Sequence, residues 1–182
     1  FGDTNDLTIE AWVYPETTSA SYPTWFGTVS GWGSQAASGF RFDNTGHAEK
    51  FGFYWYGQGG HSSGNPFMVS TNTFSHGAWH HVAFTRHKGP MSTADDITIS
   101  NSWNMYVNGA LEDTEVKTTA FDLTINGSAI RIGNQGWDGS TGDFKGYVED
   151  LRVTKGLARY PFIPTKETLS SDSNTFCLAA HA

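Results

Sequence analysis

The chain has 182 residues, of which 15% are aromatic and only 16% are charged, with 21 glycines and a formal net charge of −7. This composition is typical of a β-rich globular protein with many tight turns, and it excludes an intrinsically disordered chain. The negative charge, together with the lack of any Lys/Arg cluster in the sequence, argues against nucleic acid and anionic membranes as partners. No apolar run reaches the roughly 18 residues that a membrane-spanning helix needs, so we expect no membrane insertion.

Strand-like segments rich in β-branched and aromatic residues recur along the chain between turn signals. In chain order, the expected strands cover residues 7–15, 24–32, 38–46, 50–57, 78–86, 102–114, 120–125, 128–135, 144–154 and 175–181. In the first strand Glu10 alternates with Ile9 and Ala11, which puts its side chain on the opposite face from theirs. Within 102–114, Asn108-Gly109 predicts a tight hairpin, because both central residues of a type I′ turn need positive φ.

About ten strands with no helices between them predict antiparallel sheets, and this number favours two packed sheets over one open sheet. The expected architecture is one all-β domain covering residues 1–182. Two segments interrupt the regular spacing of the expected strands. Residues 15–40 are rich in Ser, Thr and Gly, and residues 87–100 are interpreted as a long loop between two strands. Long ordered loops in compact sandwiches often carry binding sites. Because the chain begins at Phe1 without an initiator methionine, we expect it to be a piece of a longer protein.

Five sequence blocks carry a family resemblance. They are LTIEAWVYP, WHHVAFTR, MYVNGALE, IRIGNQ and FKGYVEDLRVTKGLARY, and they occur in this order along nearly the whole chain. The order resembles that of laminin-G-like, pentraxin-like domains of the concanavalin A-like superfamily, in particular the subgroup in phage tail-fibre, capsid-associated and bacterial surface proteins. The resemblance implies a two-sheet antiparallel jelly-roll sandwich. It also implies a location outside the cell or on a virion, and a first strand that precedes the TIEAWV block and is missing here.

The acidic pair Glu149 and Asp150 tests whether the chain is an enzyme. Glucanases of the superfamily carry Glu-x-Asp-x-Glu on one strand, which places the carboxylates on one face. This sequence lacks that motif, and adjacent residues on a strand face opposite sides, so the pair cannot act together on one glycosidic bond. We therefore expect no enzymatic activity, with a glycoside hydrolase as a minor alternative.

Calcium is the cofactor that the resemblance suggests, because many concanavalin A-like domains hold this cation with carboxylate and carbonyl oxygens. The candidate ligands are Glu149 and Asp150 in the strand, and Asp95 and Asp96 in the 87–100 segment. The alternative is that Asp150 pairs with Arg152 or accepts backbone hydrogen bonds, and that the loop acids are solvated.

Two further patterns have structural interpretations. His80 and His81 diverge on a strand and have no carboxylate at ligand spacing, so we expect them to be structural. The TKGLARY segment after the strand at 144–154 carries no recognisable chemistry, and we expect Arg159 to anchor it to the sheet.

Glycan binding is the function that the aromatic residues favour, since sugar sites combine a ring face with bordering amides and carboxylates. Trp137 lies in the glycine-rich segment GNQGWDGSTGD, beside Asn134 and Asp138, and Tyr54 and Tyr56 share one strand face. The sequence thus predicts a non-catalytic surface module that recognises glycans or mediates adhesion through its loops. The alternatives are that Trp137 contacts a neighbouring subunit, and that the chain is a purely structural decoration or filament subunit of a homo-oligomeric assembly.

Overall fold

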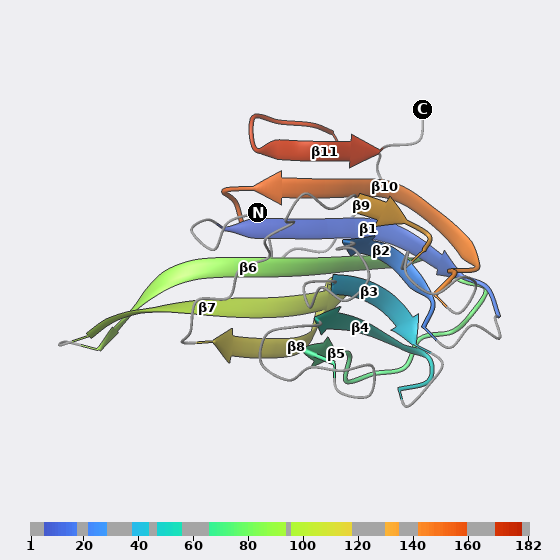
Figure 1. Cartoon of the computed structure of the whole chain (residues 1–182), viewed down its shortest axis with the longest axis horizontal. Helices are drawn as coiled ribbons and strands as arrows, with labels where there is room; N and C mark the ends of the chain where they lie inside the picture. Colours follow the sequence, from blue (N-terminus) through green and yellow to red (C-terminus); the bar gives the residue numbers. More distant parts are fainter. Residues whose placement is uncertain are drawn as a thin grey trace. The chain divides into compact units, whose positions relative to one another are not determined.

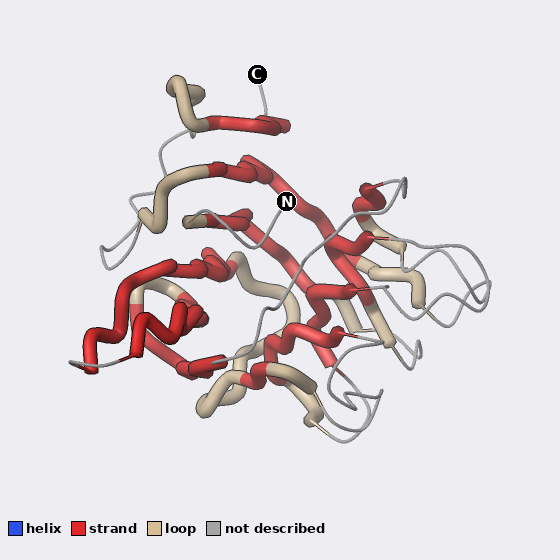
Figure 2. Tube along the Cα trace, turned by 60° about the vertical axis from the view of Figure 1, so that its left-hand side comes forward, coloured by secondary structure: helices blue, strands red, loops and turns tan. Residues whose placement is uncertain are grey.

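The computed structural model describes residues 6–17, 22–28, 38–43, 47–55, 66–93, 96–117, 130–134, 142–159 and 170–179. Throughout these ranges the regular secondary structure is β-strand, as the tube in Figure 2 shows. The described part of the chain has no helix that is long and apolar enough to cross a membrane. The expected all-β class is confirmed for this part of the chain.

In the described part of the chain, one sheet has six strands. They are β1 (Leu7–Pro15), β6 (His80–Thr93), β7 (Asp96–Val107), β8 (Ala110–Lys117), β10 (Gly146–Lys155) and β11 (Thr175–Ala179). Their order across the sheet is β11-β10-β1-β6-β7-β8 (Figure 1). Because β1 has a hydrogen-bonded neighbour on each side, it is an interior strand. A strand supplied by another molecule would therefore not pair with β1; among the described strands, the sheet ends at β11 and β8.

The second sheet has five strands. They are β2 (Thr24–Thr28), β3 (Ser38–Asp43), β4 (Lys50–Trp55), β5 (Met68–Val69) and β9 (Ile130–Ile132). Their order is β5-β4-β3-β2-β9, and every neighbouring pair is antiparallel. The short strand β5 was not expected from the sequence, because two residues carry too little periodicity to recognise. The strand expected at 120–125 lies outside the described residues.

The hairpin expected at Asn108-Gly109 is confirmed. It joins β7 to β8, and the two residues have φ values of 51° and 82°. The expected loop at 87–100 is wrong, because β6 and β7 continue through it as a paired hairpin, with Pro90 opposite Ile99. Gly89 and Pro90 suggested a loop, but the alternation of Ile97 and Ile99 with hydroxyl side chains is a strand pattern.

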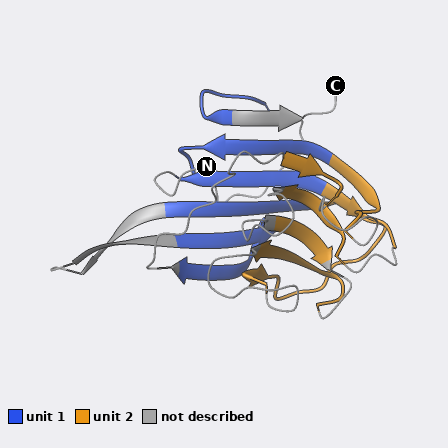
Figure 3. Ribbon diagram, viewed as in Figure 1, with its two compact units in different colours: residues 1–12, 81–123, 149–182 blue, residues 13–80, 124–148 orange. Residues whose placement is uncertain are grey.

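The chain divides into two compact units, shown in Figure 3. Unit 1 comprises residues 1–12, 81–123 and 149–182, and unit 2 comprises residues 13–80 and 124–148. The core of unit 1 combines aliphatic and aromatic side chains: Leu7, Ile9, Ala11, Val82, Phe84, Trp103, Met105, Val107, Leu151 and Val153. The core of unit 2 is aromatic. There the paired residues Phe40 and Phe53 stack with ring centroids 4.5 Å apart.

Candidate functional site

Asn134 and Asp143, which stand on either side of the undescribed residues 135–141, lie next to each other in unit 2. The Asn134 side chain donates a hydrogen bond to the Asp143 carboxylate. On the β2 side, the Thr24 amide donates to the Gly142 carbonyl at 3.1 Å, and the Gly133 amide donates to the Trp25 carbonyl at 3.0 Å. Both ends of the loop are therefore fixed next to each other on β2.

Several candidate site residues lie outside the described residues. These are Trp137 and Asp138 in the 134–143 loop, Tyr56 after β4, and Asp95 between β6 and β7. Asp96 is described as the first residue of β7, where it pairs with Thr93.

Tyr54 offers no free ring face to a ligand, contrary to the expectation from strand alternation. Its side chain is fully buried, and the Arg41 guanidinium lies 4.2 Å from the ring centroid. Arg41 also lies 4.9 Å from the Tyr22 ring, so a cation is held between two aromatic faces. The ring lies against Gly52, where a Cβ would come within 2.9 Å of Tyr54 Cε2.

Sequence reasoning missed an aromatic cluster in unit 2, formed by Tyr14, Trp79 and Tyr147. The ring centroids are 5.4 Å apart for Tyr14 and Trp79, 5.7 Å for Tyr14 and Tyr147, and 6.5 Å for Trp79 and Tyr147. Tyr147 is 58% exposed, while the other two rings are half-buried. Trp79 lies within the expected strand at 78–86, a position that favours a core residue. The alternation of Tyr14 with Ala11 and Val13 was the one available signal, and it indicated only that the Tyr14 ring lies off the apolar face.

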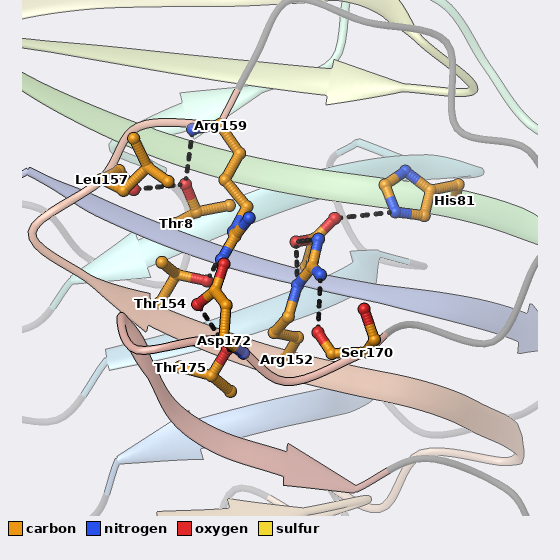
Figure 4. Close-up of polar contacts among 10 residues, drawn as sticks. Thr8, His81, Arg152, Thr154, Leu157, Arg159, Ser170, Asp172 and Thr175 are labelled. Carbon is orange, nitrogen blue, oxygen red and sulfur yellow. Dashed lines mark hydrogen bonds and ion pairs between the residues drawn. The ribbon is translucent and has the colours of Figure 1, made fainter.

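A buried ion-pair network occupies the polar face of unit 1 (Figure 4). Arg152 binds Glu10 through Nε at 2.7 Å and Nη2 at 2.6 Å, and His81 Nε2 lies 3.2 Å from the other Glu10 oxygen. All three side chains are buried, and Arg152 Nη1 also donates to the Ser170 carbonyl at 3.2 Å. Glu10 thus links β1 to β6 and β10, and the expected structural role of His81 follows from this contact. The partner of Arg152 is Glu10, so the alternative pairing with Asp150 is wrong.

Arg159 anchors the segment after β10 to the sheet, as the sequence predicted. Its Nε donates to Thr154 Oγ1 at 2.9 Å, and its amide donates to Thr8 Oγ1 at 3.0 Å. Its guanidinium also pairs with Asp172, and Figure 4 shows these contacts side by side. The hydrogen bond from Arg159 is the main cause that lowers the pKa of Asp172 from 3.8 to about 2, helped by Thr175 and the Asn174 amide.

This shift predicts an acid-dependent contribution to stability from Asp172. Because its pKa is lower in the folded than in the unfolded chain, the carboxylate stabilises the fold fully above about pH 4. The contribution is lost as the pH falls through about 2. We expect the difference in free energy of unfolding between the unmodified chain and Asp172→Asn to shrink over this range, measured by urea unfolding at a series of pH values. A difference that stays constant with pH would contradict the assignment.

Asp150 lies in an unusual backbone position in β10. Its φ is 51°, so the regular alternation that put Glu149 and Asp150 on opposite faces is interrupted there. The Asp150 side chain is buried, and its Oδ1 atom has no hydrogen-bond partner among the described residues. One orphaned oxygen fits a cation ligand, but the described residues contain no group of three or more His, Cys, Asp or Glu side chains that could hold a metal ion. Calcium binding at Asp150, with Glu149 half-buried beside it, therefore stays a prediction.

Comparison with known proteins places the chain in a family. The family model of the concanavalin A-like lectin/glucanases superfamily, of laminin-G type, matches residues 1–157. Among curated proteins, none matches the sequence.

Solved structures share the fold. A candidate carbohydrate-binding protein from Bacteroides ovatus has a TM-score of 0.62 at 17% identity, over 97% of this chain and 45% of that chain. The chain therefore spans less than half the length of that protein. The CBM40 module of the Ruminococcus gnavus IT-sialidase has a TM-score of 0.55 at 16% identity, over 89% of this chain and 79% of that chain. The same module bound to α2,6-sialyllactose gives a TM-score of 0.52 at 15% identity, with the same coverage. From its sequence match and its two antiparallel sheets, the chain belongs to the concanavalin A-like lectin/glucanase superfamily.

Proposed function

We propose that this chain is a non-catalytic glycan-binding module whose working surface is the loop from Asn134 to Asp143. The observation that carries the proposal is the fixed base of the loop, where backbone hydrogen bonds to β2 and the Asn134–Asp143 contact hold both ends. A site whose flanking residues are already held in place loses less conformational entropy when a ligand binds. Trp137 supplies a ring face for the sugar, while Asn134 and Asp138 supply polar groups for its hydroxyls.

The comparisons support the ligand class. The Ruminococcus gnavus module, which has the same fold, was solved with α2,6-sialyllactose bound. The Bacteroides ovatus protein is described as carbohydrate binding. The contacts of Glu10 remove one described carboxylate from the candidates for hydrolysis. Glu10 is engaged by Arg152 and His81 away from solvent, and a hydrolase needs two carboxylates free to flank one bond.

The setting of the module belongs to the same proposal. We place it on an extracellular or virion surface, as part of a larger chain or a homo-oligomeric assembly. The resemblance of DLRVTKGLARY to surface proteins of phages and bacteria supports this setting. The purely structural alternative is favoured by Leu111 and Val116, which are 56% and 48% exposed on the terminal strand β8. Sedimentation analysis together with the glycan array separates the two, since a purely structural subunit forms oligomers through β8 and binds no glycan.

Replacing Trp137 with alanine tests the proposed function. We expect the unmodified chain to bind a subset of glycans on an array that carries neutral and sialylated oligosaccharides. We expect Trp137→Ala to weaken this binding roughly tenfold or more, because truncated aromatic anchors at binding sites have effects of this size.

The matched control is Trp137→Phe, which retains a ring and should retain most of the affinity. Thermal unfolding of both variants checks that the fold is intact. Repeating the array with calcium and with a chelator shows whether a cation takes part. If the unmodified chain binds no glycan on the array, the proposal is overturned.

A further inference from the structure

The aromatic cluster of Tyr14, Trp79 and Tyr147 has the properties of a ligand surface. The three residues come from the end of β1, the segment before β6 and the start of β10. The Tyr147 ring is inclined by 63° to Tyr14 and by 44° to Trp79, so neither neighbour stacks flat on it. Among the large apolar side chains exposed in the described part of the chain, Tyr147 is the aromatic one. A ring that is braced by two others and open to solvent offers a rigid face at a low entropic cost.

We propose that this cluster is a second glycan contact, where Tyr147 stacks on one neutral hexose unit of an oligosaccharide that also reaches the neighbouring residues Asn134 and Asp143. This assignment rests on the proposed function, and it extends the site from a single sugar to a chain of sugars.

The charges around the cluster favour a neutral sugar. The Glu16 amide donates to the Lys145 carbonyl at 2.9 Å, which places these two exposed residues next to each other beside Tyr14 and Tyr147 in the sequence. Their opposite charges offset each other, and the net charge of −7 over the whole chain disfavours an anionic ligand. A glutamate carboxylate can accept hydrogen bonds from sugar hydroxyls, and a lysine ammonium group can donate to them.

The chain itself limits the distance between the cluster and the loop. Asp143, at the loop base, precedes Tyr147 by four residues. Even a fully extended chain of this length spans at most about 14 Å between the two Cα atoms. One oligosaccharide of a few units can therefore reach both Tyr147 and Asp143, which predicts that affinity rises with glycan length.

The experiment compares four variants with the unmodified chain on one array that carries neutral and sialylated glycans, from monosaccharides to tetrasaccharides. We expect Tyr147→Ala to weaken binding of the neutral oligosaccharides about tenfold, which corresponds to one aromatic contact of about 1.4 kcal/mol, with little effect on monosaccharides. Tyr147→Phe keeps the ring and should bind like the unmodified chain. Leu111→Ala removes an equally exposed apolar side chain on β8 and should also leave binding unchanged. Trp137→Ala is the fourth variant.

The possible results separate this inference from the proposed function. If Trp137→Ala loses binding while Tyr147→Ala keeps it at every glycan length, the loop is the site and the second contact is overturned. If Tyr147→Ala loses binding while Trp137→Ala keeps it, the aromatic contact is supported and the loop is overturned. Binding that is restricted to sialylated glycans would overturn the neutral assignment. An unmodified chain that binds no glycan would overturn both proposals.

Discussion

Replacing Glu10 with glutamine is expected to lower the free energy of unfolding by about 3–5 kcal/mol, because it removes the one negative charge from a buried ion-pair network. The Glu10 carboxylate accepts two close contacts from Arg152 and a third from His81, and none of the three side chains is open to solvent. A neutral amide cannot balance the positive charge of the Arg152 guanidinium. Urea unfolding followed by tryptophan fluorescence measures the loss.

Two further variants make the Glu10 result specific. Glu16→Gln removes an exposed glutamate just after β1, and it should change the free energy of unfolding by no more than about 0.5 kcal/mol. The double variant Glu10→Gln, Arg152→Met removes both charges, and it should recover much of the stability that the single change loses. If Glu10→Gln unfolds within about 1 kcal/mol of the unmodified chain, the network does not hold β1, β6 and β10 together as described.

Most strands could be predicted from the sequence, but the side chains that bury their polar residues could not. Alternation correctly separated Glu10 from Ile9 and Ala11, yet a polar face usually means a solvated one. Here Glu10 is buried because His81 and Arg152 come from strands 71 and 142 residues away along the chain, respectively. No local sequence pattern can predict a contact between residues so far apart along the chain. The Asn108-Gly109 turn, in contrast, was predictable because its conformation depends on those two residues alone.

The candidate site also combines residues that the sequence could indicate with residues that only the fold brings together. Trp137 could be selected because glycines flank it, and such a tryptophan is hard to explain as core. The aromatic cluster could not, because Tyr14, Trp79 and Tyr147 each occupy an ordinary strand position and meet only through the fold. The burial of Tyr54 depends in the same way on Arg41, which lies on the neighbouring strand β3.

Gly146 controls how closely β10 approaches the end of β1, and its replacement by alanine is the second large effect that we expect. Its φ is 142°, in a region that side chains rarely adopt, and a Cβ there would lie 1.9 Å from the Tyr14 carbonyl oxygen. Because that contact is with backbone, no side-chain rotation can relieve it. We expect Gly146→Ala to lower the free energy of unfolding by about 3 kcal/mol or more, from backbone strain and the clash together.

The control for Gly146 is Gly156→Ala, since Gly156 also has a positive φ, of 84°, but nothing lies within 4 Å of its added Cβ. Strain alone should then cost about 1–2 kcal/mol. A second readout follows from position, because Gly146 precedes Tyr147 and contacts Tyr14, the two rings that meet in the aromatic cluster. Gly146→Ala should therefore weaken the near-ultraviolet circular dichroism of the aromatic residues below the unfolding temperature, while Gly156→Ala should not. Equal losses of stability in the two variants would show that β10 can move away from Tyr14 at little cost, and that the cluster does not depend on this close approach.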